Sequence, residues 1–390
     1  MINSVEPAID PKNRIDFLID WEVTLKCNLD CSYCVNDPIS GGHWTLAKHP
    51  PLNECLDTID FAYKYADLYM KIKPKYSRRA VLNVYGGESL LHPNIVEILA
   101  AAHNKHKSYD WPLTINTTTN AIIGKTRMLE IIPYINEFTL SYHTESLPKQ
   151  KQQFKENTLL IKEANVRHKV VVIMSSDYTK WTDLLELIEW CKDNDVKYLA
   201  RQVDGGIDTQ IYNNEQLAWF KQEYTSRASS SSKQIQEKMI TASGAFDSSN
   251  SLTEKGRSCC GGRSLCVNNN HKQRLSWAPY ANFKDWHCTV NQYFMFIKQN
   301  NGDVYVNKDC RMRFDGTVGP IGNLNNWQDI IHTTSDMIDS KSLSVMKCAK
   351  SRCLCGLCSP KAAKFDDLQK IMKPHLLPGF ELNSNDDNNN

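Results

Sequence analysis

Short apolar runs alternate with amphipathic stretches from Ile15 to about Val203. Each stretch between the runs places apolar residues on one face of a helix, as Ile59, Ala62 and Ala66 do. This alternation predicts repeated βα units around a parallel sheet, with one stripe of each helix covering the sheet. The six predicted strands are Phe17–Leu25, Ala80–Tyr85, Leu113–Thr117, Phe138–Tyr142, Val170–Met174 and Lys197–Arg201.

A different pattern follows the sixth predicted strand. The run SRASSSS at residues 226–232 is polar and low in complexity, which predicts a linker or an insertion. Farther along, apolar runs at Tyr293–Lys298 and Val304–Asn307 flank an Asn-Gly pair, which is the strongest short signal for a β-hairpin. The run NSNDDNNN from Asn383 is too polar to bury and is predicted to be disordered.

These patterns predict two domains, as expected for a chain of 390 residues. The predicted fold class is α/β, with a partial (β/α)6 TIM-like barrel followed by a small C-terminal cysteine-rich α+β domain. The predicted segments are an N-terminal tail at 1–14, a core at 15–205, a linker or insertion at 206–256, the cysteine-rich domain at 257–375 and a disordered tail at 376–390.

Charge and hydropathy restrict the partners. The 46 basic and 44 acidic residues leave a net charge of +2, so composition does not favour nucleic acid or an anionic membrane as a partner. The first 20 residues lack the apolar run of a secretory signal, and no segment has the length of a membrane span. We therefore expect a cytoplasmic protein, in which neighbouring cysteines are metal ligands or redox groups rather than disulfides.

The 14 cysteines are concentrated in two regions of the chain, one of them directly after the first predicted strand. There Cys27, Cys31 and Cys34 have the spacing C-x3-C-x2-C. Structural zinc sites and ordinary iron–sulfur sites have four protein ligands, whereas a cubane held by three thiolates leaves one iron open for a substrate or cofactor. A zinc site completed by His43 or by a distant residue is the alternative interpretation.

With Tyr33 at the aromatic position, this segment resembles the C-x3-C-x-aromatic-C motif of the radical S-adenosylmethionine (SAM) superfamily. The resemblance implies a [4Fe–4S] cluster whose open iron binds SAM. It also implies reductive cleavage of SAM to a 5′-deoxyadenosyl radical, which abstracts a hydrogen from the substrate. In such an enzyme the cofactors carry the difficult chemistry, and the protein supplies orientation and exclusion of water.

Three later segments lie at strand ends where this family binds SAM. The family's Gly-Gly-Glu, which lies beside the methionine amino group, corresponds to Gly86–Glu88, and its glycines let the backbone approach a ligand closely. After the third strand, Ala121 replaces the glycine of the family's Thr-Asn-Gly. Ser141 and His143 end the fourth strand and are either SAM contacts or ordinary turn residues. The predicted SAM-binding residues are Tyr33, Gly86, Gly87, Glu88, Thr119, Asn120 and Ser141.

The C-terminal cysteines resemble the SPASM or twitch extensions of radical SAM enzymes, which hold an auxiliary [4Fe–4S] cluster. Their spacing after the hairpin, C-x4-C-x-C-x2-C, departs from the full SPASM pattern, so we expect at least one auxiliary cluster without assigning two. A zinc site with four cysteine ligands is the alternative. The preferred ligands are Cys288, Cys310, Cys355 and Cys358; Cys348 and Cys353 are candidates for the same or another site, and Cys259, Cys260 and Cys266 for a further cluster or the substrate pocket.

The resemblance implies a radical SAM enzyme that modifies a peptide or protein and takes electrons from a reductant such as flavodoxin or ferredoxin. Sugar modification and a non-catalytic zinc or iron–sulfur protein are alternatives. Modification of RNA or a nucleoside is a third, and it predicts a basic face. That face is supplied by a cluster that we otherwise interpret as a solvated helix end, namely Lys71, Lys73, Lys75, Arg78 and Arg79.

Overall fold

The structure is a computed structural model of the chain. It describes residues 16–34, 47–202, 212–227, 284–307, 312–313, 317–348, 361–362 and 364–384.

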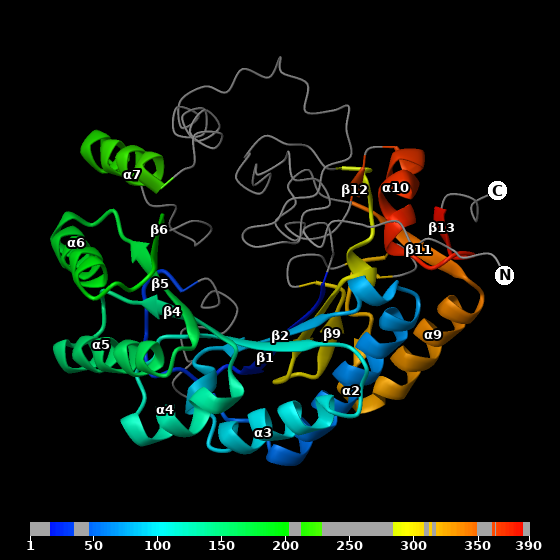
Figure 1. The fold of residues 1–390 in the computed structure, drawn as a ribbon, viewed down its shortest axis with the longest axis horizontal. Helices are drawn as coiled ribbons and strands as arrows, with labels where there is room; N and C mark the ends of the chain where they lie inside the picture. The colour runs from blue at the N-terminus through cyan, green and yellow to red at the C-terminus, as the bar shows by residue number, and fades with distance from the viewer. Residues whose placement is uncertain are drawn as a thin grey trace.

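A curved nine-stranded sheet forms the body of the molecule (Figure 1). Six of its strands are parallel and adjacent in chain order, and they agree with the six predicted from sequence. This order confirms the predicted partial (β/α)6 barrel. The strands are β1 (Phe17–Thr24), β2 (Ala80–Gly86), β3 (Leu113–Thr119), β4 (Glu137–Tyr142), β5 (Arg167–Met174) and β6 (Tyr198–Gln202).

Helices between these strands lie along the convex side of the sheet (Figure 1). Alternate side chains of β1 point to them, and Phe17, Ile19 and Trp21 are at most 1% exposed. Fully burying such side chains stabilises the fold by about 1.5–3 kcal/mol each. The helices are α2 (Leu52–Lys71), α3 (Ile95–His106), α4 (Lys125–Ile131), α5 (Pro148–Glu163) and α6 (Tyr178–Asp193), with short 3₁₀ turns η3 (Lys75–Ser77), η4 (Ser89–Leu91) and η5 (Ile132–Tyr134).

The opposite, concave face of the first strands is polar. Asn83 Nδ2 on β2 donates to Asp20 Oδ1 on β1 at 2.6 Å, and Asn116 Nδ2 on β3 donates to Asn83 Oδ1 at 3.4 Å. These three positions are opposite one another in the strand registers. The barrel therefore has an apolar face that packs against helices and a polar face that lines its interior.

The predicted hairpin is confirmed as β8 (Phe294–Lys298) and β9 (Asp303–Tyr305). It does not form a sheet of its own, because β8 pairs in parallel with β1 and β10 (Gly322–Asn323) pairs with β9 at the sheet edge. Helix α9 (Trp327–Asp339) follows the 3₁₀ turn η9 (Leu324–Asn326). The pairing supplies β1 with a neighbour on its second edge and continues the core sheet into the C-terminal part of the chain.

A second, four-stranded sheet has the order β12-β7-β11-β13. Its last strand, β13 (Glu381–Ser384), pairs with β11 and buries Leu382. The first part of the tail that was predicted to be disordered from residue 376 therefore contains a strand. The remaining elements of this region are β7 (His287–Cys288), η8 (Val290–Gln292), β11 (Ser342–Lys347), β12 (Lys361–Ala362), α10 (Phe365–Met372) and η11 (Lys373–His375).

The segment predicted as a linker or insertion contains a helix, α7 (Asn214–Arg227). Phe220 on this helix is 1% exposed and packs edge-to-face against Trp181 and Tyr212. Aromatic burial therefore orders a stretch that has no clear strand pattern in the sequence. Among the described residues, no helix combines the length and the apolar character needed to cross a membrane.

Candidate functional site

The loop after β1 carries the three predicted cluster ligands at the carboxyl edge of the sheet, where barrels of this kind place their sites. Cys27, Cys31 and Cys34 are all partly buried. The Leu29 backbone N–H donates to Cys27 Sγ at 3.4 Å, and Cys34 N donates to Cys31 O at 3.0 Å. Short-range hydrogen bonds thus fold the loop back on itself, with one of them directed at a sulfur.

The glycine turn after β2 packs directly against the start of this loop. Gly87 N donates to Thr24 O at 2.9 Å, and Glu88 N donates to Lys26 O at 2.8 Å. A Cβ at Gly86 would lie 2.0 Å from Thr24 O, and one at Gly87 would lie 2.3 Å from the Leu25 carbonyl oxygen. Both positions therefore need glycine for close approach of two backbones, in addition to any approach to a ligand.

Glu88 connects the ends of β2 and β3. Its Oε1 accepts from Thr119 Oγ1 at 2.6 Å and from Leu90 N at 3.1 Å, and its Oε2 accepts from Asn120 N at 2.6 Å. The residue is 1% exposed, and burial raises the pKa of its carboxyl to about 6 despite these three donors. In the described structure Glu88 therefore holds the predicted SAM-binding residues of β3 in place.

Asn120 extends this network to the cysteine loop. Its Nδ2 donates to Asn28 Oδ1 at 2.8 Å, and Asn28 Nδ2 in turn donates to Ile122 O at 2.9 Å. The residue that follows, Ala121, has a φ of +54° and is fully buried. This left-handed conformation explains why glycine suits the position, and an alanine there is strained.

The end of β4 reaches the cysteine loop from the other side. His143 Nδ1 lies 3.3 Å from Cys31 Sγ and 3.2 Å from the Tyr33 hydroxyl, and the two rings stack at 5.9 Å. Burial lowers the pKa of His143 to about 4, so the imidazole is neutral at pH 7. From the sequence, His143 was either a SAM contact or an ordinary turn residue. The structure shows that it contacts Cys31, a predicted cluster ligand.

Glu145 is a site residue that the sequence did not indicate. Its carboxylate accepts from Ser32 N at 2.8 Å and from Ser32 Oγ at 2.6 Å, and Lys180 Nζ donates to it at 2.8 Å. These contacts fix the segment between Cys31 and Cys34. The only available signal was its place three residues after a strand end, which many surface carboxylates share.

The donor set fits an iron–sulfur cluster. Burial and the nearby Glu88 and Cys34 charges raise the pKa of the Cys27 thiol to about 11, so a cationic partner is needed to hold it as a thiolate. No three His, Cys, Asp or Glu side chains of the described residues gather as ligands of a single metal ion. A [4Fe–4S] cluster binds each thiolate at a different iron, and three partly buried cysteines on one loop fit that requirement. His43, the ligand of the zinc alternative, lies outside the described residues.

Two other predicted residues have fewer contacts with this site. Ser141 lies partly buried on β4, opposite Val171 of β5. Cys288 lies on β7 and is 6% exposed. Trp286, two residues before Cys288, accepts a hydrogen bond through its O from Cys348 N at 2.9 Å. The structure thus brings Cys288 and Cys348 into one sheet region. The other C-terminal candidates lie outside the described residues, namely Cys259, Cys260, Cys266, Cys310, Cys353, Cys355 and Cys358.

No protein-family model matches this sequence, and no curated protein matches it. Among solved structures, the chain is similar to that of Streptococcus suis SuiB bound to S-adenosylmethionine, with 15% identity, a TM-score of 0.46 and coverage of 84% of this chain and 69% of that chain. For anSMEcpe with bound AdoMet the values are 13%, 0.49, 83% and 77%. For HydG, a maturase of the [FeFe]-hydrogenase, they are 16%, 0.35, 54% and 48%.

These low scores decide neither a reaction nor a substrate. The strand topology defines the fold. Six parallel strands follow one another in chain order, and the cysteine loop lies after the first of them, at the carboxyl edge. This chain has a partial (β/α)6 barrel. The turn after β2 and the ends of β3 and β4 contact the cysteine loop.

Proposed function

We propose that this protein is a radical SAM enzyme that abstracts a hydrogen from a peptide or protein. The observation that carries the proposal is the convergence on one loop of three cysteines, the glycine turn and the ends of β3 and β4. When bound, the cluster and SAM would supply a 5′-deoxyadenosyl radical. The cluster ligands in this proposal are Cys27, Cys31 and Cys34.

The surrounding residues have distinct roles in this proposal. Glu88 fixes Thr119 and Asn120 at the end of β3, and these two residues together with Ser141 of β4 would hold SAM. Neutral His143 orients Tyr33 and contacts Cys31, which positions the loop without adding a charge. Hydrogen bonds to the sulfurs, such as the one from Leu29 N to Cys27, tune the potential of a bound cluster.

The C-terminal cysteines are proposed to hold at least one auxiliary [4Fe–4S] cluster, and a flavodoxin or ferredoxin is proposed as the reductant. The preferred ligands remain Cys288, Cys310, Cys355 and Cys358. The proximity of Cys288 and Cys348 in the second sheet supports Cys348 as an additional candidate. The preference for a peptide or protein substrate rests on the SPASM-like spacing of these cysteines.

The basic cluster of the RNA alternative is only partly exposed in the structure. Lys73 is 0% exposed, Arg79 pairs with the buried Asp16 at 3.6 Å, and Arg78 donates to the Lys73 carbonyl at 2.9 Å. These three side chains serve the fold, and Lys71 and Lys75 are the exposed members of the cluster. Because Lys73 is buried, it also does not fit the interpretation of this basic cluster as a solvated helix end.

The test is formation of 5′-deoxyadenosine from SAM by anaerobically purified, reconstituted and dithionite-reduced protein. We expect product from the parent and none from the variant in which Cys27, Cys31 and Cys34 are all alanine. A matched control is Cys191→Ala, which changes a buried cysteine of α6 remote from the loop in the chain. Equal product from the parent and the triple variant, or none from a parent whose cluster is reduced, would contradict the proposal.

A further inference from the structure

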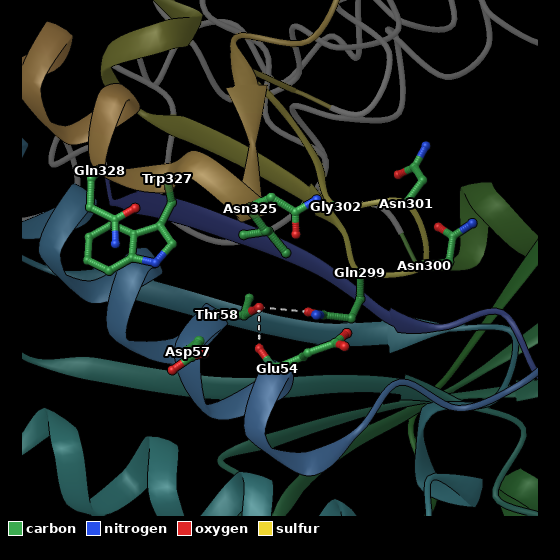
Figure 2. Close-up of a pocket in the computed structure, with 11 residues that line it drawn as sticks. Glu54, Asp57, Thr58, Gln299, Asn300, Asn301, Gly302, Asn325, Trp327 and Gln328 are labelled. Atoms are coloured by element: carbon green, nitrogen blue, oxygen red, sulfur yellow. Dashed lines mark hydrogen bonds between the residues drawn. The ribbon is translucent and has the colours of Figure 1, made fainter.

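A cavity of about 510 Å³ lies between the first turns of α2, the β8–β9 turn and the start of α9 (Figure 2). Its volume is in the range of ligand sites, roughly 300–1,000 Å³. None of the predicted SAM-binding residues lines it. Because β8 runs parallel to β1, the lining residue Gln299 lies at the same edge of the sheet as the cysteine loop, and Gln299 N donates to Glu22 O there at 3.1 Å.

Gln299 provides a directed hydrogen-bond donor at the floor of this cavity. Its Oε1 accepts from Trp21 Nε1 at 2.9 Å and lies 2.8 Å from Thr58 Oγ1. The indole can only donate, so it fixes which end of the amide is oxygen. Gln299 is 6% exposed, and its Nε2 has no hydrogen-bond partner among the described residues. Because Gln299 lines the cavity, this N–H group is available to an acceptor on a ligand.

The cavity is acidic. Glu54 and Asp57 line it from α2, and no lysine, arginine or histidine lies among its described lining residues. Neither carboxylate has an ion-pair partner in the described part of the chain. The indole of Trp327 also lines the cavity (Figure 2) and offers an aromatic face to a cation, while Lys64 Nζ lies 4.7 Å from its ring centroid.

We propose that this cavity binds a basic side chain, with arginine preferred, of the peptide substrate at a distance from the reacting carbon. The two carboxylates pair with the guanidinium, which also stacks on Trp327, and Gln299 Nε2 donates to a carbonyl of the peptide backbone. This inference rests on the proposed peptide substrate. It adds a recognition element that selects substrates by charge and needs neither the cluster nor SAM.

The test measures binding rather than turnover. N-acetyl-L-arginine amide and its neutral isostere N-acetyl-L-citrulline amide are titrated into the full-length protein and followed by saturation-transfer NMR. We expect arginine to bind about tenfold more tightly than citrulline, and the double variant Glu54→Gln with Asp57→Asn to lose this preference. Glu97→Gln is the matched control, because Glu97 is an exposed carboxylate in the first turn of α3.

The outcomes separate this inference from the proposed function. Equal affinity for arginine and citrulline, or binding of methyl glucoside with no binding of arginine, overturns the inference. Binding of arginine by the Cys27, Cys31, Cys34 triple alanine variant at the affinity of the parent supports it. A parent that prefers arginine yet forms no 5′-deoxyadenosine contradicts the proposed function alone, and the reverse result contradicts this inference alone.

Discussion

The two edges of the barrel sheet each bury an ionisable side chain, but they treat it differently. At the carboxyl edge, the Glu88 carboxylate accepts three hydrogen bonds. At the amino edge, Lys73 Nζ has no hydrogen-bond partner among the residues that the structure describes, and it lies 4.0 Å from the Tyr293 ring centroid and 5.5 Å from that of Phe17. One buried ionisable group is fully hydrogen-bonded, and the other rests on aromatic faces.

The difference follows from what each edge does. Strand ends at the carboxyl edge must hold Asn120 and the cysteine loop in a fixed arrangement, so a satisfied polar network suits it. At the amino edge, Lys73 packs beneath the C-terminal segment, where Leu377 N donates to Ile72 O at 2.8 Å. Burial there lowers the pKa of Lys73 to about 7, which favours a neutral amine over an unpaired cation.

The largest effect is expected for Glu88→Ala. The substitution leaves the donors of Leu90, Thr119 and Asn120 buried without an acceptor, so it lowers the free energy of unfolding by about 3 kcal/mol or more. Urea unfolding of the parent and the variant measures the change. Glu97→Ala is the control, because that carboxylate is exposed, and a loss no larger than that of the control would show that the network does not stabilise the edge.

Lys73→Met is expected to raise the free energy of unfolding, whereas Glu88→Ala lowers it. Replacing a buried, unpaired amine with an apolar side chain of similar length raises the free energy of unfolding by about 2 kcal/mol at pH 7. In the parent, the pKa of Lys73 is about 7 in the folded state and 10.5 for an ordinary lysine. The unfolded chain therefore binds more protons between these values, and stability increases as pH rises from about 7 to 10.5.

The Lys73→Met variant should lose this increase in stability with pH. Chemical unfolding at a series of pH values measures the change. His375 also lies at this edge; burial, followed by the nearby Lys73, lowers its pKa to about 4. Its contribution increases stability between pH 4 and 6.5 and is separate from the window of Lys73. A pH profile of Lys73→Met parallel to that of the parent above pH 7 would contradict the comparison.

The smallest effect is expected for Ala121→Gly at the carboxyl edge. Removing the Cβ relieves the left-handed strain at φ +54°, and the added flexibility of the unfolded chain offsets part of the gain. The net increase in the free energy of unfolding is about 0.5 kcal/mol. Thermal unfolding measures it against Asn165→Gly, at φ +55°, where asparagine already tolerates the conformation and a smaller change is expected.

The sequence predicted the local features of the fold well. Six strands and one hairpin were located because alternating apolar runs and an Asn-Gly turn are properties of neighbouring residues. It did not indicate that β8 pairs with β1, because nothing local connects Phe294 with Leu18 across the chain. Helix α7 and strand β13 were missed for the same reason, since their order depends on Phe220 and Leu382 packing against distant elements.

The candidate site divides in the same way. Its cysteine spacing and the Gly-Gly-Glu turn are written in the sequence, because each is a short motif with a chemical requirement of its own. Only the tertiary structure showed that Glu88 holds Asn120, that His143 contacts Cys31 and that Gln299 presents a donor to an acidic cavity. These contacts join residues from different strands, and their energies come from burial and geometry that a one-dimensional pattern does not contain.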